Sequence, residues 1–430
     1  MQLKLIYPRW AKLAGQTTFD LPPHGPVVFA AALPARVEVT FVDENVEPLD
    51  LEDAPDVVAL SMMLSAQVKR GWAIADAYRA RGIPVIAGGI ATMLHAEETL
   101  EHVDSVFLGE AEGRMDAVVA DLERGALRRV YDYLASPVDL ELVGPARREL
   151  LAADRYYHKG VRMVELFHAS RGCRFSCYPC AVSYLGGRSF RPRPLHRVRE
   201  ELARIDNGRL FVVDNSLAQD ASWLKELFRA MEPYQKTWCS HPILDDPEVL
   251  ELAARAGAWY VYQAVFDTSD YIRERIRRYH DHGIAVEGTI LLGLDDQSED
   301  DIRRLVDFLC EIDLDLAEFT VLTPFPHTRA HDELARQGRI FSRDWDAYDA
   351  GHVVFEPRQM SAERLAELYD WAWAEFYRDE SQSLKMFKLL KRAVEREQAL
   401  GTFVPRRRDL VRQSFGKELD AAPPPKGAGS

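Results

Sequence analysis

The stretch Cys173-Arg-Phe-Ser-Cys177-Tyr-Pro-Cys180 decides how this chain is understood, because it holds three of the five cysteines in the spacing C-x3-C-x2-C. It directly follows residues 163–170, a run with the pattern of a strand. Three thiolates from one short loop can hold three irons of a [4Fe-4S] cluster and leave the fourth iron without a protein ligand. The spacing therefore predicts a cluster held by Cys173, Cys177 and Cys180.

A structural zinc site or a set of buried free thiols is the alternative interpretation of these cysteines. Zinc takes four ligands, usually supplied as two separated pairs. Neither His168 nor Cys239 completes such a pattern in this sequence. The number of available ligands thus favours the iron-sulfur cluster.

On these three cysteines the chain resembles the radical S-adenosylmethionine (radical SAM) enzymes. In that superfamily the amino and carboxylate groups of S-adenosylmethionine occupy the open iron. An electron from the cluster then cleaves the cofactor to methionine and a 5′-deoxyadenosyl radical. The resemblance implies S-adenosylmethionine as a cofactor, and a reductant such as flavodoxin or ferredoxin as a partner.

Composition sets the limits for the rest of the chain. A length of 430 residues predicts two or three domains. The net charge of −14 argues against a general nucleic-acid or membrane-surface binder. Five cysteines, three of them in one loop, do not form a disulfide framework. The N-terminus lacks a signal pattern and no apolar run is long enough to span a membrane, so we expect a cytoplasmic protein.

The first part of the chain alternates short apolar runs with helical patterns, which is typical of a parallel sheet covered by helices. Strands are expected at 3–7, 37–41, 57–61, 84–87 and 105–108. In such sheets a ligand binds beyond the carboxyl ends of the strands. Unusual residues gather after these strands, among them Asp43, the pair Gly88-Gly89 and the pair Gly109-Glu110.

This order of motifs resembles the cobalamin-binding domain that precedes many radical SAM enzymes. The resemblance covers about the first 120 residues: an LPP-G segment, a D-x-N loop, an S-x3-S loop, a GG pair and a GE pair. It implies that cobalamin contacts Pro23, Asp43, Ser61, Ser65, Gly88, Gly89, Gly109 and Glu110. The segment that begins at Asp43 lacks the histidine that binds cobalt in other cobalamin proteins. A relic domain that no longer binds the corrin is the alternative.

A second series of strands begins at the cysteine loop. Strands are expected at 163–170, 209–213, 236–239, 259–265, 285–293 and 316–322, with helices between them. Six strands with five helices predict an incomplete (β/α)6 version of the eight-fold parallel barrel. The expected fold is α/β: a Rossmann-like cobalamin-binding-type domain at 1–125, a linker at 126–162, a partial radical SAM barrel at 163–330, a mostly helical C-terminal extension at 331–415 and a disordered tail at 416–430.

The barrel's strand ends indicate where S-adenosylmethionine binds. Active sites of such barrels lie at the carboxyl ends of the strands. By resemblance to the superfamily, the cofactor-binding candidates are Tyr178, Pro179, Asp214, Asn215, Gln263, Asp267 and Glu287. Pro179 stands where most relatives have an aromatic residue before the third cysteine. Each polar residue could instead cap a strand or form a turn.

Three arginines follow the cysteine loop. Arg188, Arg191 and Arg193 are candidates to bind an anionic substrate or a corrin side chain, because guanidinium groups match carboxylate and phosphate. The alternative is an exposed basic segment in an acidic protein.

The resemblance implies a cobalamin-dependent radical SAM enzyme that methylates an unactivated carbon of a small-molecule or lipid substrate, with methylcobalamin as the methyl donor. A cyclase or carbon-skeleton rearrangement enzyme, with or without cobalamin, is the first alternative. An iron-sulfur electron-transfer or sensor protein is the second, and it would not need a six-stranded barrel with polar strand ends.

Overall fold

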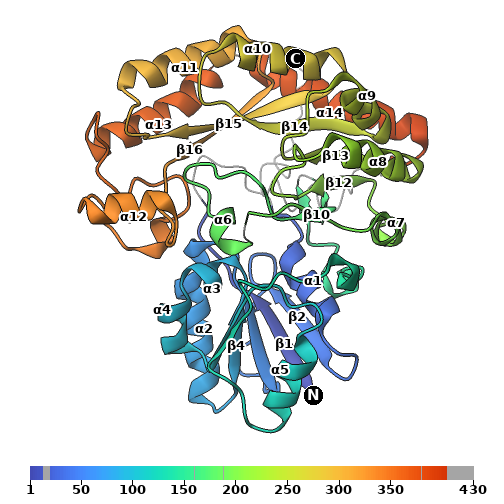
Figure 1. Cartoon of the computed structure of the whole chain (residues 1–430), viewed down its shortest axis with the longest axis vertical. Helices are drawn as coiled ribbons and strands as arrows, with labels where there is room; N and C mark the ends of the chain where they lie inside the picture. Colours follow the sequence, from blue (N-terminus) through green and yellow to red (C-terminus); the bar gives the residue numbers. More distant parts are fainter. Residues whose placement is uncertain (13–19, 159, 187, 379, 404–430) are drawn as a thin grey trace, which may run out of the picture.

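The computed structural model describes residues 1–12, 20–158, 160–186, 188–378 and 380–403, and its two parallel sheets stand one above the other (Figure 1). Each sheet has six strands. The segment that carries the cysteines lies between them, around α6 (Val182–Leu185) and β10 (Ser170–Arg171) (Figure 1). The predicted α/β fold class is confirmed.

The first sheet has the strand order β2-β1-β3-β4-β5-β6, all parallel. Its strands are β1 (Gln2–Tyr7), β2 (Glu38–Asp43), β3 (Val57–Ser61), β4 (Val85–Gly88), β5 (Ser105–Leu108) and β6 (Val130–Asp132). The strand β6 extends the sheet past residue 125, into the segment expected as a linker.

Alternating side chains of these strands form two cores, one on each face of the sheet. On one face Leu5 and Phe107 pack with residues of α1 (His24–Ala32) and α5 (Met115–Glu123). On the other face Ile6 and Val58 pack with residues of α2 (Val68–Ala80) and α3 (Ile90–Leu94), while α4 (Ala96–His102) runs beside them. The sheet is therefore covered on both faces, as a parallel sheet requires.

The second sheet has the order β16-β15-β14-β13-β12-β9 and is parallel throughout. The strands are β9 (Glu165–Phe167), β12 (Arg209–Val212), β13 (Thr237–Ser240), β14 (Ala258–Ala264), β15 (Ala285–Leu292) and β16 (Leu316–Val321). The helices α7 (Leu195–Arg204), α8 (Ala221–Met231), α9 (Pro247–Ala256), α10 (Asp270–Asp281) and α11 (Glu299–Glu311) connect them. The first and last strands do not pair with each other, so the barrel stays open, as the sequence predicts.

Local signals explain where the barrel helices begin. Asp220, Asp246, Ser269 and Ser298 each accept a hydrogen bond from a backbone N–H in the first turn of the following helix. Such caps satisfy donors that have no partner within the helix. They fix the start of α8, α9, α10 and α11 just beyond the preceding strand ends or loops.

Three helices follow the barrel: α12 (Arg329–Arg336), α13 (Ala362–Phe376) and α14 (Glu380–Leu400). Just after α13, the Tyr377 hydroxyl accepts from the Ala317 N–H at 3.0 Å and donates to the Ala317 carbonyl at 2.8 Å. Arg209 of β12 donates to both carboxylate oxygens of Glu397 of α14, at 2.6 and 2.7 Å. The expected disordered tail at 416–430 lies outside the described residues. In the described part of the chain, every helix is too short or too polar to cross a bilayer.

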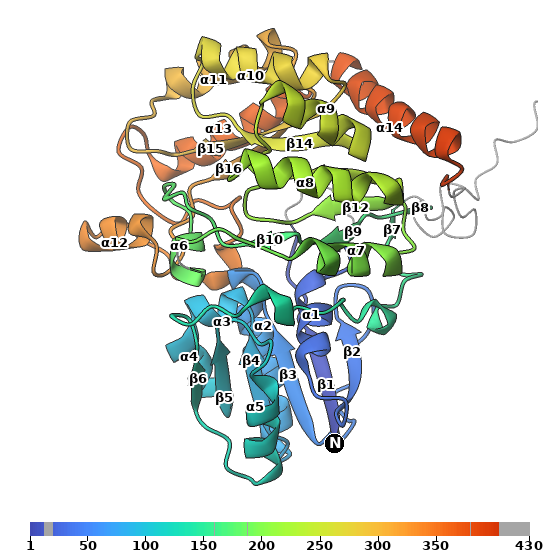
Figure 2. The same ribbon diagram turned by 45° about the vertical axis from the view of Figure 1, so that its right-hand side comes forward.

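The carboxyl ends of the first sheet point at the second unit (Figure 2). The strand β1 begins at the far end of the molecule and runs toward the cysteine segment (Figure 2). The carboxyl edge of the first sheet therefore faces the segment that carries the cysteines.

Candidate functional site

The cysteine loop is closed at its base by a two-stranded ribbon. The strand β10 (Ser170–Arg171) pairs antiparallel with β11 (Arg191–Pro192), and the three cysteines lie on the chain between them. Gly172 enters the loop with a φ of +78°, and a Cβ atom there would come 2.0 Å from the Ser189 carbonyl oxygen. Only glycine fits this position.

The three thiols differ in exposure. Cys173 is buried, whereas Cys177 and Cys180 are exposed. Gln219 Nε2 approaches Cys173 Sγ at 3.4 Å, and the Val182 N–H approaches Cys180 Sγ at 3.5 Å. Although residue 180 is exposed overall, partial desolvation of its thiol raises the pKa of Cys180, the Val182 N–H opposes this shift, and the neighbouring Cys177 and Cys173 add to it.

The remaining two cysteines lie away from the loop. Cys239 is buried in β13, where burial raises the pKa of its thiol to about 12, and Cys310 is exposed on α11. No three His, Cys, Asp or Glu side chains among the described residues are placed to hold a single metal ion. A [4Fe-4S] cluster differs from such a site, because each thiolate binds a different iron. The donor set of this loop, three cysteines, matches the three thiolates that such a cluster with one open iron takes.

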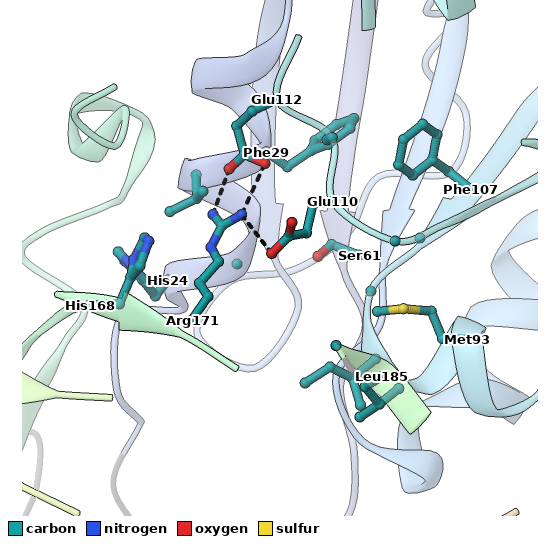
Figure 3. A pocket seen from close by; sticks show the side chains of 18 of the residues that line it. His24, Phe29, Ser61, Met93, Phe107, Glu110, Glu112, His168, Arg171 and Leu185 are labelled. Carbon is teal, nitrogen blue, oxygen red and sulfur yellow. Dashed lines mark hydrogen bonds and ion pairs between the residues drawn. The ribbon is translucent and has the colours of Figure 1, made fainter. Parts of the chain in front are cut away.

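A cavity of about 400 Å³ lies between the carboxyl end of the first sheet and the base of the cysteine loop (Figure 3). Its deep wall is apolar and includes Leu5, Ala59, Ile86 and Phe107 from the sheet. On the opposite side it is lined by Val182, Leu185 and Gly186, which directly follow the cysteines. Residues expected at different cofactors, Ser61, Gly88, Gly89, Gly109, Glu110, Asp214 and Asn215, all line this one cavity.

The glycines that line this cavity are required for different structural reasons. Gly89 and Gly109 have φ values of +96° and +104°, and Cβ atoms there would come within 2.4 Å of Met62 and 2.8 Å of Tyr133 backbone atoms. Their backbone conformation alone explains them. Gly88 has no such conflict, since the nearest atom to its Cβ would be the Phe107 oxygen at 3.7 Å. Gly88 is thus the glycine that leaves room for a ligand, which fits a corrin at this edge.

The other residues expected at cobalamin do not line the cavity. Pro23 stands before the first turn of α1. Asp43 is buried and accepts hydrogen bonds from Asn45 and from the Tyr156 hydroxyl, the latter at 3.1 Å. The Ser65 hydroxyl lies 2.8 Å from His95 Nε2. Their internal partners account for the polar groups of Asp43 and Ser65.

Asp214 braces the start of the cysteine segment. Its carboxylate accepts from the Ala169 N–H at 2.8 Å and from the Ser170 hydroxyl. Burial raises the pKa of this carboxyl to about 6, although these hydrogen bonds oppose the shift. Both oxygens already have partners, so the expected contact with the cofactor's ammonium group would be additional to this bracing.

The remaining candidates for S-adenosylmethionine lie elsewhere around the barrel. Tyr178 is exposed with the Arg329 guanidinium 5.5 Å from its ring, and Pro179 follows it. Gln263 accepts from Arg275 at 2.8 Å, and Asp267 is exposed and caps the Ser269 N–H at 2.9 Å. The structure does not bring these four residues to the cavity.

Glu287 belongs to a polar group inside the barrel that the sequence did not reveal. It lies opposite Tyr262 in the register of β14 and β15, and the Tyr262 hydroxyl bonds to it. Burial, and then the charge of Glu318, raise the pKa of Glu287 to about 8. The hydroxyls of Tyr260 and Tyr262 are 3.3 Å apart. Period-two alternation places these side chains on one face, but which strands are neighbours is a property of the fold.

The three candidate substrate arginines have different surroundings. Arg188 is exposed in the cysteine segment. Arg191 lines the cavity and donates to Glu110 at 2.6 and 3.1 Å. Arg193 is 1% exposed and is bound by Glu201 and by the His168 carbonyl, so internal partners account for its guanidinium group.

Two histidines and one arginine at the cavity were not anticipated. His24 Nε2 and His168 Nδ1 are 2.7 Å apart, and burial lowers both pKa values, that of His24 to about 3. Arg171 binds Glu112 and Glu110 (Figure 3). His24 lies inside the LPP-G segment, and Arg171 stands two residues before Cys173, so their neighbours in sequence were the available signal.

Comparison with known proteins agrees with this arrangement. Residues 11–119 match the B12 binding domain family. The bacteriochlorophyllide d C-12(1)-methyltransferase of Chlorobaculum tepidum is 26% identical over 378 residues, which are 82% of each chain. The hopanoid C-2 methylase of Rhodopseudomonas palustris is 25% identical over 384 residues, 79% of this chain and 71% of the relative.

A solved structure has the same fold. It is that of the radical S-adenosylmethionine methyltransferase TsrM from Kitasatospora setae, with cobalamin and a [4Fe-4S] cluster bound. The match has a TM-score of 0.61 at 16% identity and covers 78% of this chain and 75% of TsrM. With a B12-binding domain, an open parallel barrel and a three-cysteine loop facing one cavity, the chain is similar over most of its length to the B12-binding-domain radical SAM enzymes, the family of the cobalamin-dependent radical SAM methyltransferases.

Proposed function

We propose that this protein transfers a methyl group to an unactivated carbon of a small-molecule or lipid substrate. One observation carries the proposal: the same cavity is lined by strand ends of the B12-binding domain and by the residues that flank the cysteine loop. Two cofactors held on opposite walls of one space can act on one substrate there. The named relatives, which methylate bacteriochlorophyllide and hopanoid, support this reaction class.

The chain's own residues would hold and orient the cofactors. Cys173, Cys177 and Cys180 would bind the cluster, and Gly88 with the neighbouring strand ends would accept the corrin. When bound, the cluster with S-adenosylmethionine supplies radical chemistry, and cobalamin supplies the methyl group. The protein's contribution is placement: the apolar wall offers few hydrogen-bond partners to water, while Asp214 holds the backbone at the base of the cysteine loop. A flavodoxin or ferredoxin would deliver the electron.

The first prediction tests the cluster and the reaction class together. Anaerobically reconstituted protein should hold about four irons per chain. With a strong reductant it should cleave S-adenosylmethionine slowly to 5′-deoxyadenosine, even without a substrate. The triple variant Cys173→Ala, Cys177→Ala, Cys180→Ala should lose the iron and the cleavage. A matched Cys239→Ala, Cys310→Ala variant should keep both.

The products separate the alternatives. Formation of S-adenosylhomocysteine together with 5′-deoxyadenosine indicates methyl transfer. Formation of 5′-deoxyadenosine alone, with substrate consumed, would point instead to a cyclisation or rearrangement. An iron-loaded protein that never yields 5′-deoxyadenosine would leave only the electron-transfer interpretation.

A further inference from the structure

The base of the cysteine loop carries two arginines side by side. In the ribbon of β10 and β11, Arg171 is the direct partner of Arg191. Like charges opposite each other destabilise a strand pair. All three cysteines lie on the chain between these two arginines, so whatever holds the ribbon together also holds the cysteine loop.

Two carboxylates from the B12-binding domain neutralise this pair. Arg171 donates to the two oxygens of Glu112 at 2.5 and 3.1 Å. Arg191 donates to the two oxygens of Glu110 at 2.6 and 3.1 Å, and Arg171 lies 3.4 Å from Glu110 as well. Forked guanidinium–carboxylate pairs fix orientation as well as distance.

The carboxylates are themselves held in place. Glu110 also accepts from the Val138 N–H at 2.8 Å. Burial would raise the pKa of Glu110, yet the hydrogen bond from Arg191 and the charge of Arg171 hold it below its ordinary value. Glu110 directly follows Gly109, and both line the cavity, so the contact joins the predicted corrin site to the cysteine loop (Figure 3).

We propose that Glu110 and Glu112 are positioning residues which, through Arg171 and Arg191, set the distance and orientation between the cluster and the cobalamin. The inference rests on the proposed function, because positioning matters only if both cofactors act together. The contact of Glu110 and Glu112 with the two arginines does not depend on the substrate. Neither carboxylate is needed to bind the cluster irons. Glu110 was expected to contact cobalamin, but both of its oxygens already accept hydrogen bonds, from Arg191 and from the Val138 N–H, so Gly88 and the apolar wall remain for the corrin. Without the two carboxylates both cofactors therefore bind, while their separation is no longer fixed.

The test is the variant Glu110→Gln, Glu112→Gln, which keeps the shape of both side chains. Iron and cobalamin contents should match those of the wild type. In the wild type the reduced cluster should speed the electron-spin relaxation of bound Co(II) cobalamin, an effect that falls steeply with distance. In the variant the faster relaxation should be lost, or the relaxation rates should spread over a broad range because the cluster–cobalt distance varies. Methyl transfer should drop by about 100-fold, the scale of a 1 Å misplacement, while 5′-deoxyadenosine still forms.

The matched control removes two negative charges from α5, the helix that follows the segment of Glu110 and Glu112. Asp116→Asn, Glu123→Gln breaks the exposed ion pairs of α5 with Arg36 and should leave the relaxation unchanged. If the double variant does not fold, Arg191→Lys keeps the positive charge, loses the fork and should show a partial loss. Relaxation equal to the wild type in both Glu110→Gln, Glu112→Gln and Arg191→Lys, or in whichever of them folds, would overturn the proposal.

Failure of the proposed positioning role and failure of the proposed function give different results. Suppose that the wild type shows faster Co(II) relaxation but transfers no methyl group; this contradicts the function, and the positioning role still holds if Glu110→Gln, Glu112→Gln loses the faster relaxation. Wild-type protein that binds both cofactors without faster Co(II) relaxation would contradict the positioning role directly.

Discussion

Gly88 and Gly89 are neighbours at the end of β4, yet substitutions at the two positions test different properties. A side chain at Gly89 would collide with the backbone of Met62, so a substitution there reports on folding. A side chain at Gly88 would meet only ordinary contacts with Phe107 and would otherwise enter the cavity. A substitution at Gly88, which the fold tolerates but a bound ligand would not, is therefore the better probe of cobalamin binding.

Gly88→Leu should therefore abolish cobalamin binding by filling the cavity, while iron content and thermal stability stay close to the wild type. Gly144→Leu is the matched control, because no atom lies within 4 Å of the added Cβ there and Gly144 does not line the cavity. The measurement is the cobalt-to-iron ratio after reconstitution with both cofactors. Full cobalamin occupancy in Gly88→Leu would show that the corrin does not use this edge.

Glu287, an expected contact of S-adenosylmethionine, lowers the stability of the fold at high pH. Its ordinary pKa of 4.5 rises to about 8 in the folded chain, so the folded state holds a proton that the unfolded state has already lost. The free energy of unfolding therefore falls as the pH rises from about 4.5 to 8. Glu287→Gln should gain on the order of 2–4 kcal/mol at pH 8 and almost nothing at pH 4.5.

Urea unfolding of the cofactor-free chain at both pH values measures this difference. The exposed Glu226 of α8 provides the control, since Glu226→Gln should change the stability equally little at both. An equal effect of Glu287→Gln at the two pH values would mean that Glu287 is not held protonated.

At the scale of elements, the β10–β11 ribbon allows iron binding to be disrupted without disrupting cobalamin binding. The ribbon closes only because Gly172 adopts a positive φ directly beneath Ser189. Gly172→Ala should prevent that closure, so the protein should lose its iron and retain cobalamin, the reverse of the result at Gly88. Gly144→Ala, outside the cavity, has no atom within 4 Å of the new Cβ and should retain both. Iron and cobalt analysis distinguishes the four possible outcomes.

At the scale of the whole molecule, the sequence was most informative where structure is local. Buried parallel strands appear as apolar runs, so both sheets could be predicted. The strand β6 was missed because it has three residues and only the middle one, Tyr131, is buried. The cluster ligands were predictable because their spacing lies within one loop. The partner of Arg191 was not, since Glu110 is 81 positions away and only the docking of two domains brings them together.

The edge of the barrel has its own consequence. The strand β16 ends the second sheet, so one side of it has no neighbouring strand. Free edges invite pairing with another chain. The Tyr377 hydroxyl binds both the N–H and the carbonyl of Ala317, as a neighbouring strand would. The Tyr377 phenol thus occupies the N–H and the carbonyl of Ala317, two edge groups with which a strand of another chain would otherwise pair.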